Sequence, residues 1–453
     1  MIPVVTPEEM RAIDAAAPEP VEVLVGRAGA ALARAALEML GGTYGRRVVV
    51  VAGKGNNGAD GRDAARRLAA RGMRVDVFDA ATAPRRLPPC DLVVDAAYGT
   101  GFRGAYEAPD PGGAFVLAAD IPSGVDGLTG KAGGGAVRAD ATVTFAALKP
   151  GLLLGSGPEA AGEVIVADIG LDVSGARAHL VEAPDVAATL PVRPRDAHKY
   201  WAAVLAVAGS PGMTGAALLV ARAALRAGAG YCRLAIPGAD PAGVAPSEAV
   251  AVGVPARGWA AIAEEQCARM SAAAVGPGLG RDPGTQADAR AFVAACPLPA
   301  VVDADALFAL GDAGAAAEVL QRAPAPRVLT PHDGELARLA GAPPAADRIA
   351  SVRDLAARTG AAVLLKGPLT IVADPGGRVL LSGTGGPALA TAGTGDVLTG
   401  VVAAFCAMGT GPFEAAALGA FVHGLAGRSG PRVGLVAGDV ADRLPAALSG
   451  LLP

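Results

Sequence analysis

The segment Thr391–Gly400, TAGTGDVLTG, places one carboxylate among glycines just before an apolar, helix-forming run at Val397–Met408. Glycines 393 and 395 let the backbone approach a phosphate closely, and the free N–H groups at the start of a helix favour negative charge there. An acid in that first turn can take a proton from a hydroxyl as the hydroxyl attacks phosphorus. The segment therefore predicts a phosphoryl-transfer site with Asp396 as base. The alternative is a flexible loop entering a helix that Asp396 caps.

Three Gly-rich motifs follow predicted strands in the first half of the chain: GKGNNGADG (Gly53–Gly61), DAAYGTGFRG (Asp95–Gly104) and DIPSGVDG (Asp120–Gly127). Ligands of an open parallel sheet bind beyond the carboxyl ends of its strands, so we expect the motifs to meet at one sheet edge. Each motif alone is more typical of a tight turn with structural Asp and Gly than of a binding site. Their convergence favours a binding site.

Polar side chains in these motifs have types suited to binding and proton transfer. The amides of Asn56 and Asn57 offer hydrogen-bond partners, and Asp95 and Ser123 add hard oxygens suitable for a monovalent cation. Asp120 follows a buried strand, where desolvation can raise the pKa of a carboxyl group enough for acid–base work.

Composition excludes several classes of protein. In 453 residues, 52% of them hydrophobic, no apolar run reaches the ~18 residues of a membrane span without Arg, Gly or Pro. No signal peptide is evident, so we expect a cytoplasmic protein without a membrane partner. The five scattered cysteines indicate neither disulfides nor structural zinc. A net charge of −4 without basic blocks gives no footprint for nucleic acid.

Both halves of the chain alternate apolar runs with helix-length spacers, which predicts a doubly wound α/β domain followed by a second α/β domain. In the first half we expect strands at 48–51, 74–80, 91–101, 114–124, 141–149 and 162–170, and helices at 6–18, 21–40 and 60–71. In the second half we expect strands at 203–208, 231–236, 300–303, 327–330 and 362–366, and helices at 212–230, 397–408, 412–424 and 438–448. The polar, proline-spaced stretch 180–194 is the predicted linker.

Four further segments fit the pocket of Asp396: GMTGA (212–216), GPGLG (276–280), TPHDGE (330–335) and KGPLT (366–370). The chain has only five lysines, so Lys366 is expected to serve as a point charge for a nucleotide phosphate. His332 is one of four histidines, and a structural role for it is as plausible as a ligand contact.

The three N-terminal motifs, with ALKPGL (Ala147–Leu152), resemble the N-terminal domain of the bifunctional NAD(P)H-hydrate repair enzymes over roughly residues 1–190. The resemblance implies a Rossmann-like domain that epimerises the R and S hydrates of NADH and NADPH with a bound K⁺. It assigns K⁺ to Asn57, Asp95 and Ser123, and proton transfer at the hydrated ring carbon to Asp120. Ala59 stands where the family usually has glycine. The implied substrate contacts are Asn56, Asn57, Gly58, Ala59, Asp60, Gly99, Thr100, Gly101, Phe102, Arg103, Gly104, Ala105 and Asp120.

The C-terminal motifs resemble the ribokinase-like domain of the same enzymes, from about His198 to residue 453. The resemblance implies dehydration of the S-hydrate, in which the ring hydroxyl is activated by Asp396, phosphorylated by ADP and expelled as phosphate, with Mg²⁺ as the metal. The implied hydrate contacts are Ala216, Gly278, Gly280, His332 and Asp396. The implied nucleotide contacts are Lys366, Gly367, Pro368, Leu369, Thr370 and Gly395.

Two other functions fit parts of the pattern. A ribokinase-type hydroxyl kinase acting on a vitamin precursor would also carry a GTGD segment with Asp as base. Alternatively, the N-terminal domain could bind nucleotide without catalysis. The joint presence of Asp95, Asp120 and Ser123 favours a catalytic N-terminal domain over one that only binds nucleotide. We also expect a homo-oligomer.

Overall fold

The computed structural model describes residues 1–104 and 106–451, and the chain forms two compact units. We call residues 2–178 the N-terminal unit, and Met1 with residues 179–453 the C-terminal unit. The domain ranges expected from the sequence, 1–190 and 198–453, stay a prediction.

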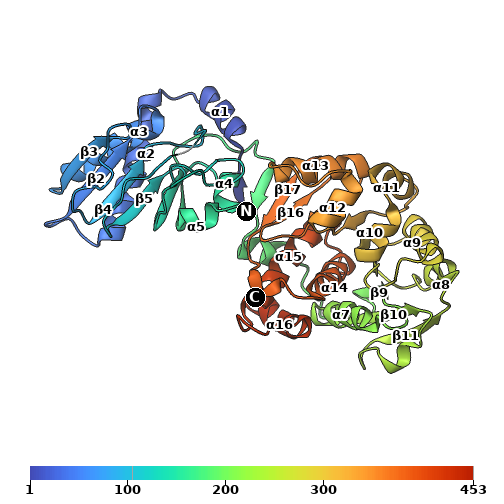
Figure 1. The fold of residues 1–453 in the computed structure, drawn as a ribbon. Coiled ribbons are helices and arrows are strands. Elements are labelled where there is room, and N and C mark those ends of the chain that lie inside the picture. Colours follow the sequence, from blue (N-terminus) through green and yellow to red (C-terminus); the bar gives the residue numbers. More distant parts are fainter. Residues whose placement is uncertain (105, 452–453) are drawn as a thin grey trace. The chain divides into compact units, whose positions relative to one another are not determined.

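A parallel sheet of order β3-β2-β4-β5-β6-β7 forms the centre of the N-terminal unit (Figure 1). Its strands are β2 (Arg47–Ala52), β3 (Arg74–Asp79), β4 (Leu92–Ala96), β5 (Phe115–Ala119), β6 (Ala141–Phe145) and β7 (Glu163–Ala167). The chain runs from β2 outward to β3 and then returns to β4 on the other side of β2. The strand order therefore reverses between β2 and β4, and open sheets bind ligands beyond the carboxyl ends of the strands at such a point.

The two faces of this sheet are covered differently. Helices α2 (Val21–Leu40) and α3 (Asn56–Ala69) pack on one face, where they bury Val48 and Val50. Val49 and Val51 point to the opposite face, as the period of two in a strand requires. That face is covered by Tyr106, Val137, Ala139 and their irregular loops. The remaining elements are β1 (Ile2–Val4), α1 (Pro7–Ala16), α4 (Pro150–Leu153) and α5 (Gly157–Ala161).

The sheet of the C-terminal unit runs in the order β8-β17-β16-β15-β14-β13-β12-β9-β10-β11. Its strands are β8 (Ala178–Leu180), β9 (Ala203–Val207), β10 (Tyr231–Pro237), β11 (Val250–Val254), β12 (Ala272–Val275), β13 (Ala300–Val302), β14 (Arg327–Leu329), β15 (Ala362–Leu365), β16 (Thr370–Ala373) and β17 (Val379–Ser382). From β15 to β11 all neighbours are parallel, whereas β15, β16 and β17 form an antiparallel meander. The strand order reverses beside β9, between β10 and β12.

One apolar core joins a face of this sheet to α7 (Thr214–Arg226), α14 (Thr394–Ala407), α15 (Pro412–Arg428) and α16 (Ala437–Ser449). The predicted cluster of C-terminal helices on one face is thus confirmed. The other helices are α6 (Ala183–Thr189), α8 (Trp259–Glu265), α9 (Pro283–Ala295), α10 (Ala304–Leu310), α11 (Ala313–Leu320), α12 (Asp333–Ala340) and α13 (Arg348–Thr359).

The structure has several elements that the sequence analysis did not expect, among them β11, β12, β16, β17 and helices α8 to α13, and it differs from two explicit expectations. The stretch 180–194 is not a simple linker, because it contains α6, and Val186 and Leu190 are buried in the core of the C-terminal unit. Helix α3 begins at Asn56 rather than near Asp60. Within the described residues, no helix combines the length and apolarity that crossing a membrane requires.

Candidate active sites

A buried ion pair lies at the carboxyl edge of the N-terminal sheet. Asp120 follows β5, and Lys149 donates to its Oδ1 at 2.6 Å, to Thr144 Oγ1 at 2.9 Å and to the carbonyl of Phe145 at 2.9 Å. The lysine side chain is only 1% exposed. Asp120 has a φ of 64°, in the left-handed region that favours glycine. A strained backbone that holds a charged side chain in place is typical of functional sites.

The charge of Asp120 acts on two further carboxylates, Asp60 and Asp14. Burial, followed by the charges of Asp120, Asp63 and Asp14, raises the pKa of Asp60 to about 8. Burial and the charge of Asp120 also raise the pKa of Asp14, which is on α1. At neutral pH, Asp60 therefore carries a proton beside an aspartate that is paired with lysine, and the site holds both an acid and a base.

The loops after β2 and β4 interlock beside Asp120. A Cβ atom on Gly53 would collide with the carbonyl oxygen of Ala97, so only glycine allows this approach. A Cβ on Gly99 would lie 3.4 Å from Asp120 Oδ2 and 3.5 Å from Asn57 Cβ. Among the described residues, both polar atoms of the Asn57 amide are buried without a hydrogen-bond partner. Such orphaned atoms indicate a place for a ligand.

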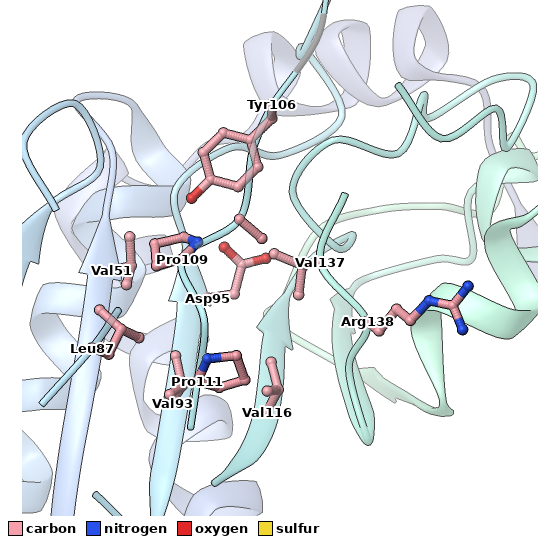
Figure 2. A pocket seen from close by; sticks show the side chains of 11 residues that line it. Val51, Leu87, Val93, Asp95, Tyr106, Pro109, Pro111, Val116, Val137 and Arg138 are labelled. Carbon is pink, nitrogen blue, oxygen red and sulfur yellow. The ribbon is translucent and has the colours of Figure 1, made fainter. Parts of the chain in front are cut away.

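Asp95 and Ser123 are joined by hydrogen bonds near the same edge of the sheet. The Ser123 amide donates to Asp95 Oδ2 at 2.8 Å, and its hydroxyl is 2.7 Å from Asp95 Oδ1. Burial, opposed by these hydrogen bonds, raises the pKa of Asp95 to about 6. Figure 2 shows Asp95 and the Tyr106 hydroxyl facing one cavity of about 50 Å³ with otherwise largely apolar walls. This cavity is far smaller than the ~300 Å³ or more that an organic ligand needs.

The remaining predicted contacts of the N-terminal unit lie on both sides of this site. Asn56, Gly58, Ala59 and Asp60 form the first turns of α3. Thr100 lies against Gly127, and Gly101 is exposed beside it. Phe102, Arg103 and Gly104 line a separate open cavity of about 290 Å³. Ala105 lies outside the described residues.

In the C-terminal unit, Lys366 forms the centre of a charged cluster after β15. Its Nζ donates to Asp303 Oδ1 at 2.8 Å and lies 3.6 Å from Glu335 Oε2. Asp303 is 2% exposed and also accepts a hydrogen bond from Thr399 Oγ1 at 2.7 Å. Burial lowers the pKa of Lys366, but Asp303 and Glu335 outweigh that effect and raise it. The lysine thus stays charged at the end of the strand.

Asp396 lies in the first turn of α14, and the helix begins after Gly393 in the left-handed conformation (φ 88°). Burial, followed by the charge of Asp303, raises its pKa to about 6, although Lys366 opposes the shift. A Cβ on Gly395 would lie 3.6 Å from Lys366 Nζ. Asp396, the free N–H groups of the helix and the lysine ammonium therefore share one small region, as phosphoryl transfer requires.

The glycine loops GMTGA and GPGLG meet where the strand order reverses. Ser210 Oγ donates to the carbonyl of Gly278 at 2.9 Å, and a Cβ on Gly278 would lie 2.9 Å from Ala216 Cβ. Gly280 donates its N–H to Asp305 Oδ2 at 2.9 Å. The structure thus brings Ala216, Gly278 and Gly280 together at the ligand-binding edge of the sheet.

His332 caps helix α12. Its Nδ1 accepts from the amides of Gly334 at 3.0 Å and Glu335 at 3.3 Å, and its side chain is 59% exposed. Its Nε2 lies 3.5 Å from Glu335 Oε1, and Glu335 in turn lies 3.6 Å from Lys366 Nζ, so Glu335 connects the cap to the lysine. Residues Gly367, Pro368 and Leu369 lie in the turn from β15 into β16, and Thr370 is the first residue of β16.

Sequence reasoning did not assign roles to Lys149, Asp303, Glu335 and Thr399. The first three carried a signal: Lys149 is one of five lysines, Asp303 ends a predicted strand, and Glu335 lies in TPHDGE. Nothing in the sequence distinguishes Thr399 from an ordinary helix residue.

Comparison with known proteins agrees with both halves of this description. A family model described as NAD(P)H-hydrate dehydratase matches residues 204–445, and a model described as the N-terminus of YjeF-related proteins matches residues 21–88 and 78–151. The bifunctional NAD(P)H-hydrate repair enzyme Nnr of Moorella thermoacetica is 38% identical over 90% of this chain and 88% of its own length. The enzyme of the same description from Mycobacterium tuberculosis is 40% identical over 83% of this chain and 82% of its own.

Solved structures match the C-terminal part. The ADP/ATP-dependent NAD(P)H-hydrate dehydratase of Bacillus subtilis, co-crystallised with ATP and Mg²⁺, is 29% identical with a TM-score of 0.50, and the match covers 60% of this chain and 97% of that one. A ribokinase-like superfamily protein of Enterococcus faecalis has a TM-score of 0.52 at 22% identity, over 61% of this chain and 96% of its own. This second likeness shows the fold alone, which is the predicted ribokinase-like one.

Proposed function

This chain belongs to the family of bifunctional NAD(P)H-hydrate repair enzymes, and from that premise we propose how its residues divide the work. The protein repairs hydrated NADH and NADPH: the N-terminal unit epimerises the R and S hydrates, and the C-terminal unit dehydrates the S-hydrate in a nucleotide-dependent reaction. One observation supports the division most strongly. Each unit holds one aspartate, Asp120 or Asp396, next to a lysine-centred charge cluster at the carboxyl edge of its sheet.

In the C-terminal unit, we assign Asp396 as the base that removes the proton from the ring hydroxyl. The hydroxyl oxygen then forms a bond to the terminal phosphorus of the nucleotide, and the bond from that phosphorus to its bridging oxygen breaks. Phosphate leaves with the former hydroxyl oxygen, and loss of a proton from the neighbouring ring carbon restores the double bond. Lys366 and the N–H groups beginning at Gly395 neutralise the phosphoryl charge. We propose ADP as the nucleotide, with AMP held by residues 366–370.

Mg²⁺ would be held in this unit by Asp303 and Glu335, the two carboxylates that already flank Lys366. Mg²⁺ typically takes one or two carboxylates and completes its shell with water and substrate phosphates. When bound, the ion supplies positive charge to the phosphoryl oxygens.

In the N-terminal unit, we assign Asp120 to proton transfer at the hydrated ring carbon, with Lys149 holding its carboxylate in place through the ion pair and Asp60 as the neighbouring acid. K⁺ would be held by Asn57, Asp95 and Ser123. The orphaned Asn57 amide and the hard oxygens of the other two fit a monovalent cation. When bound, the cation supplies positive charge at the edge where substrate enters.

The test is to incubate the purified chain with mixed R and S hydrates of NADPH and ADP, and to follow dihydropyridine absorbance. Complete conversion, with one AMP and one phosphate per NADPH, is expected. Conversion that stops at the S fraction would refute the epimerase assignment. The alternative of a ribokinase-type hydroxyl kinase is not favoured, because relatives matched over 83% to 95% of the chain are repair enzymes by name. Such a kinase would consume nucleotide without forming NADPH.

A further inference from the structure

The N-terminal unit has a second, larger hollow beside the predicted catalytic edge. A cavity of about 290 Å³ opens between the loop after β4, at Phe102–Gly104, and the hairpin formed by residues 124–133. Within the hairpin, Val125 pairs with Ala132, and the Asp126 amide donates to the Lys131 carbonyl at 2.9 Å. The position of Lys131 is thus fixed by its backbone.

The charge of this cavity is positive. Arg103 and Lys131 line it, opposed by Asp126. Asp126 stays ionised, because hydrogen bonds from Leu128 and Thr129, together with Arg103, outweigh burial and lower its pKa. Its carboxylate lies 3.6 Å from Arg103 and so neutralises that side chain. The Lys131 ammonium is exposed and has no such partner in the described part of the chain.

Both walls of the cavity continue directly from the catalytic edge. The loop at 102–104 begins three residues after Gly99, which adjoins Asp120 and Asn57. The hairpin begins four residues after Asp120, and Gly127 packs against Thr100. A ligand that reaches from Asp120 past Gly99 therefore enters a hollow with one unpaired positive charge. A hydrated dinucleotide has that form, since its reacting ring is joined to phosphoryl groups.

We propose that this cavity binds a phosphoryl group of the dinucleotide hydrate in the epimerase site, and that Lys131 supplies the charge that recognises it. This inference rests on the epimerase function proposed above. The group is either the pyrophosphate, present in both hydrates, or the 2′-phosphate, present only in the NADPH hydrate. Lys131 lines this cavity whereas Asp120, the residue assigned to the ring carbon, does not, so Lys131 should affect binding of substrate rather than the rate of the chemical step.

The experiment measures KM and kcat for loss of the R-hydrate by the full chain at low salt, after subtraction of an enzyme-free control. Lys131→Met is expected to raise KM about three- to tenfold with kcat unchanged, the effect of one partly exposed charge pair at low salt. Lys131→Arg should restore most of the affinity. Asp126→Asn keeps an acceptor for Leu128 and Thr129 but releases Arg103, so it should lower KM. Arg74→Met, which removes an exposed charge at the opposite end of β3, should change nothing.

The change in KM for the NADH hydrate, compared with that for the NADPH hydrate, shows which phosphoryl group the cavity binds. An equal rise in KM for the NADH and NADPH hydrates assigns the pyrophosphate, and a rise for the NADPH hydrate alone assigns the 2′-phosphate. An unchanged KM for both hydrates in Lys131→Met, or a fall in kcat without a rise in KM, would overturn the proposal. ADP-dependent dehydration of the S-hydrate by each variant checks that the chain is intact. Failure of the unsubstituted chain to convert R-hydrate would instead reject the epimerase function itself.

Discussion

Replacing Gly395 with alanine should strengthen the fold and weaken catalysis at the same time. Gly395 is the second residue of α14 and has no positive φ, so alanine fits its backbone. A Cβ there meets nothing closer than Lys366 Nζ at 3.6 Å and Asp303 Oδ2 at 4.0 Å. Glycine to alanine within a helix stabilises by roughly 0.5–1 kcal/mol, which corresponds to a rise in Tm of about 1–3 °C for a unit of this size.

The new methyl group would occupy the space that a phosphate bound to Lys366 must enter. A phosphate oxygen hydrogen-bonded to the ammonium lies about 2.8 Å from Nζ, so it would be in close contact with the methyl carbon. Loss of one charge-assisted hydrogen bond costs about 1.5–3 kcal/mol, which predicts a rise in KM for ADP of roughly 10- to 150-fold. Initial rates of NADPH formation from the S-hydrate at varied ADP measure it.

Gly438→Ala provides the matched control, because Gly438 is also the second residue of its helix and has nothing within 4 Å of an added Cβ. It should raise Tm by a similar amount and leave the kinetic constants unchanged. If Gly395→Ala binds ADP as tightly as the unsubstituted chain, the nucleotide does not approach α14 at this point and the assignment of the phosphate site is wrong.

Three further predictions follow from the charged groups of the two sites. The pKa of Asp396 is raised to about 6, so kcat for dehydration should fall tenfold per pH unit below about pH 6 as the base becomes protonated; a rate independent of pH from 5 to 8 would exclude Asp396 as base. Lys149→Met should leave Asp120 as an unpaired buried carboxylate, abolish epimerisation and destabilise the N-terminal unit by about 3–5 kcal/mol, as denaturant unfolding would measure; a loss below 1 kcal/mol would contradict a buried ion pair. K⁺ should raise the Tm of the N-terminal unit more than Li⁺ does, and Asp95→Asn should remove the difference; equal effects of both ions on the unsubstituted chain would argue against the K⁺ site.

Most strands were predictable because their apolar runs are rich in branched residues and are bounded by glycine. Strands β1, β8, β11, β12, β16 and β17 were not predicted. In β12 the sequence, AAAV, has no branched residue until its last position. The segment at Ala183–Thr189 reads as linker from its prolines and acids, yet tertiary burial of Val186 makes it part of the core. Local composition cannot report that burial.

The position of both sites was predictable, because motifs of glycine and carboxylate residues directly follow predicted strands. The early start of α3 could not be predicted, because the residues NNGAD show no helical spacing of apolar side chains. It depends on the close packing of Gly58 against the backbone of Gly53 and of Gly61 against the side chain of Ala96. The partners of Asp120 and Lys366 are residues 29 and 63 positions away in sequence. Only the strand order brings such pairs together, so no local pattern could identify them.

The central claim is that two separate sites in one chain act in succession on the same damaged cofactor. Complementation between Asp120→Asn and Asp396→Asn tests it most directly. With mixed NADPH hydrates and ADP, Asp120→Asn should stop after the S fraction, and Asp396→Asn should form no NADPH while still interconverting the two hydrates. An equimolar mixture of the variants should convert everything. A mixture that stops where Asp120→Asn stops, or either variant losing both activities, would contradict the two-site account.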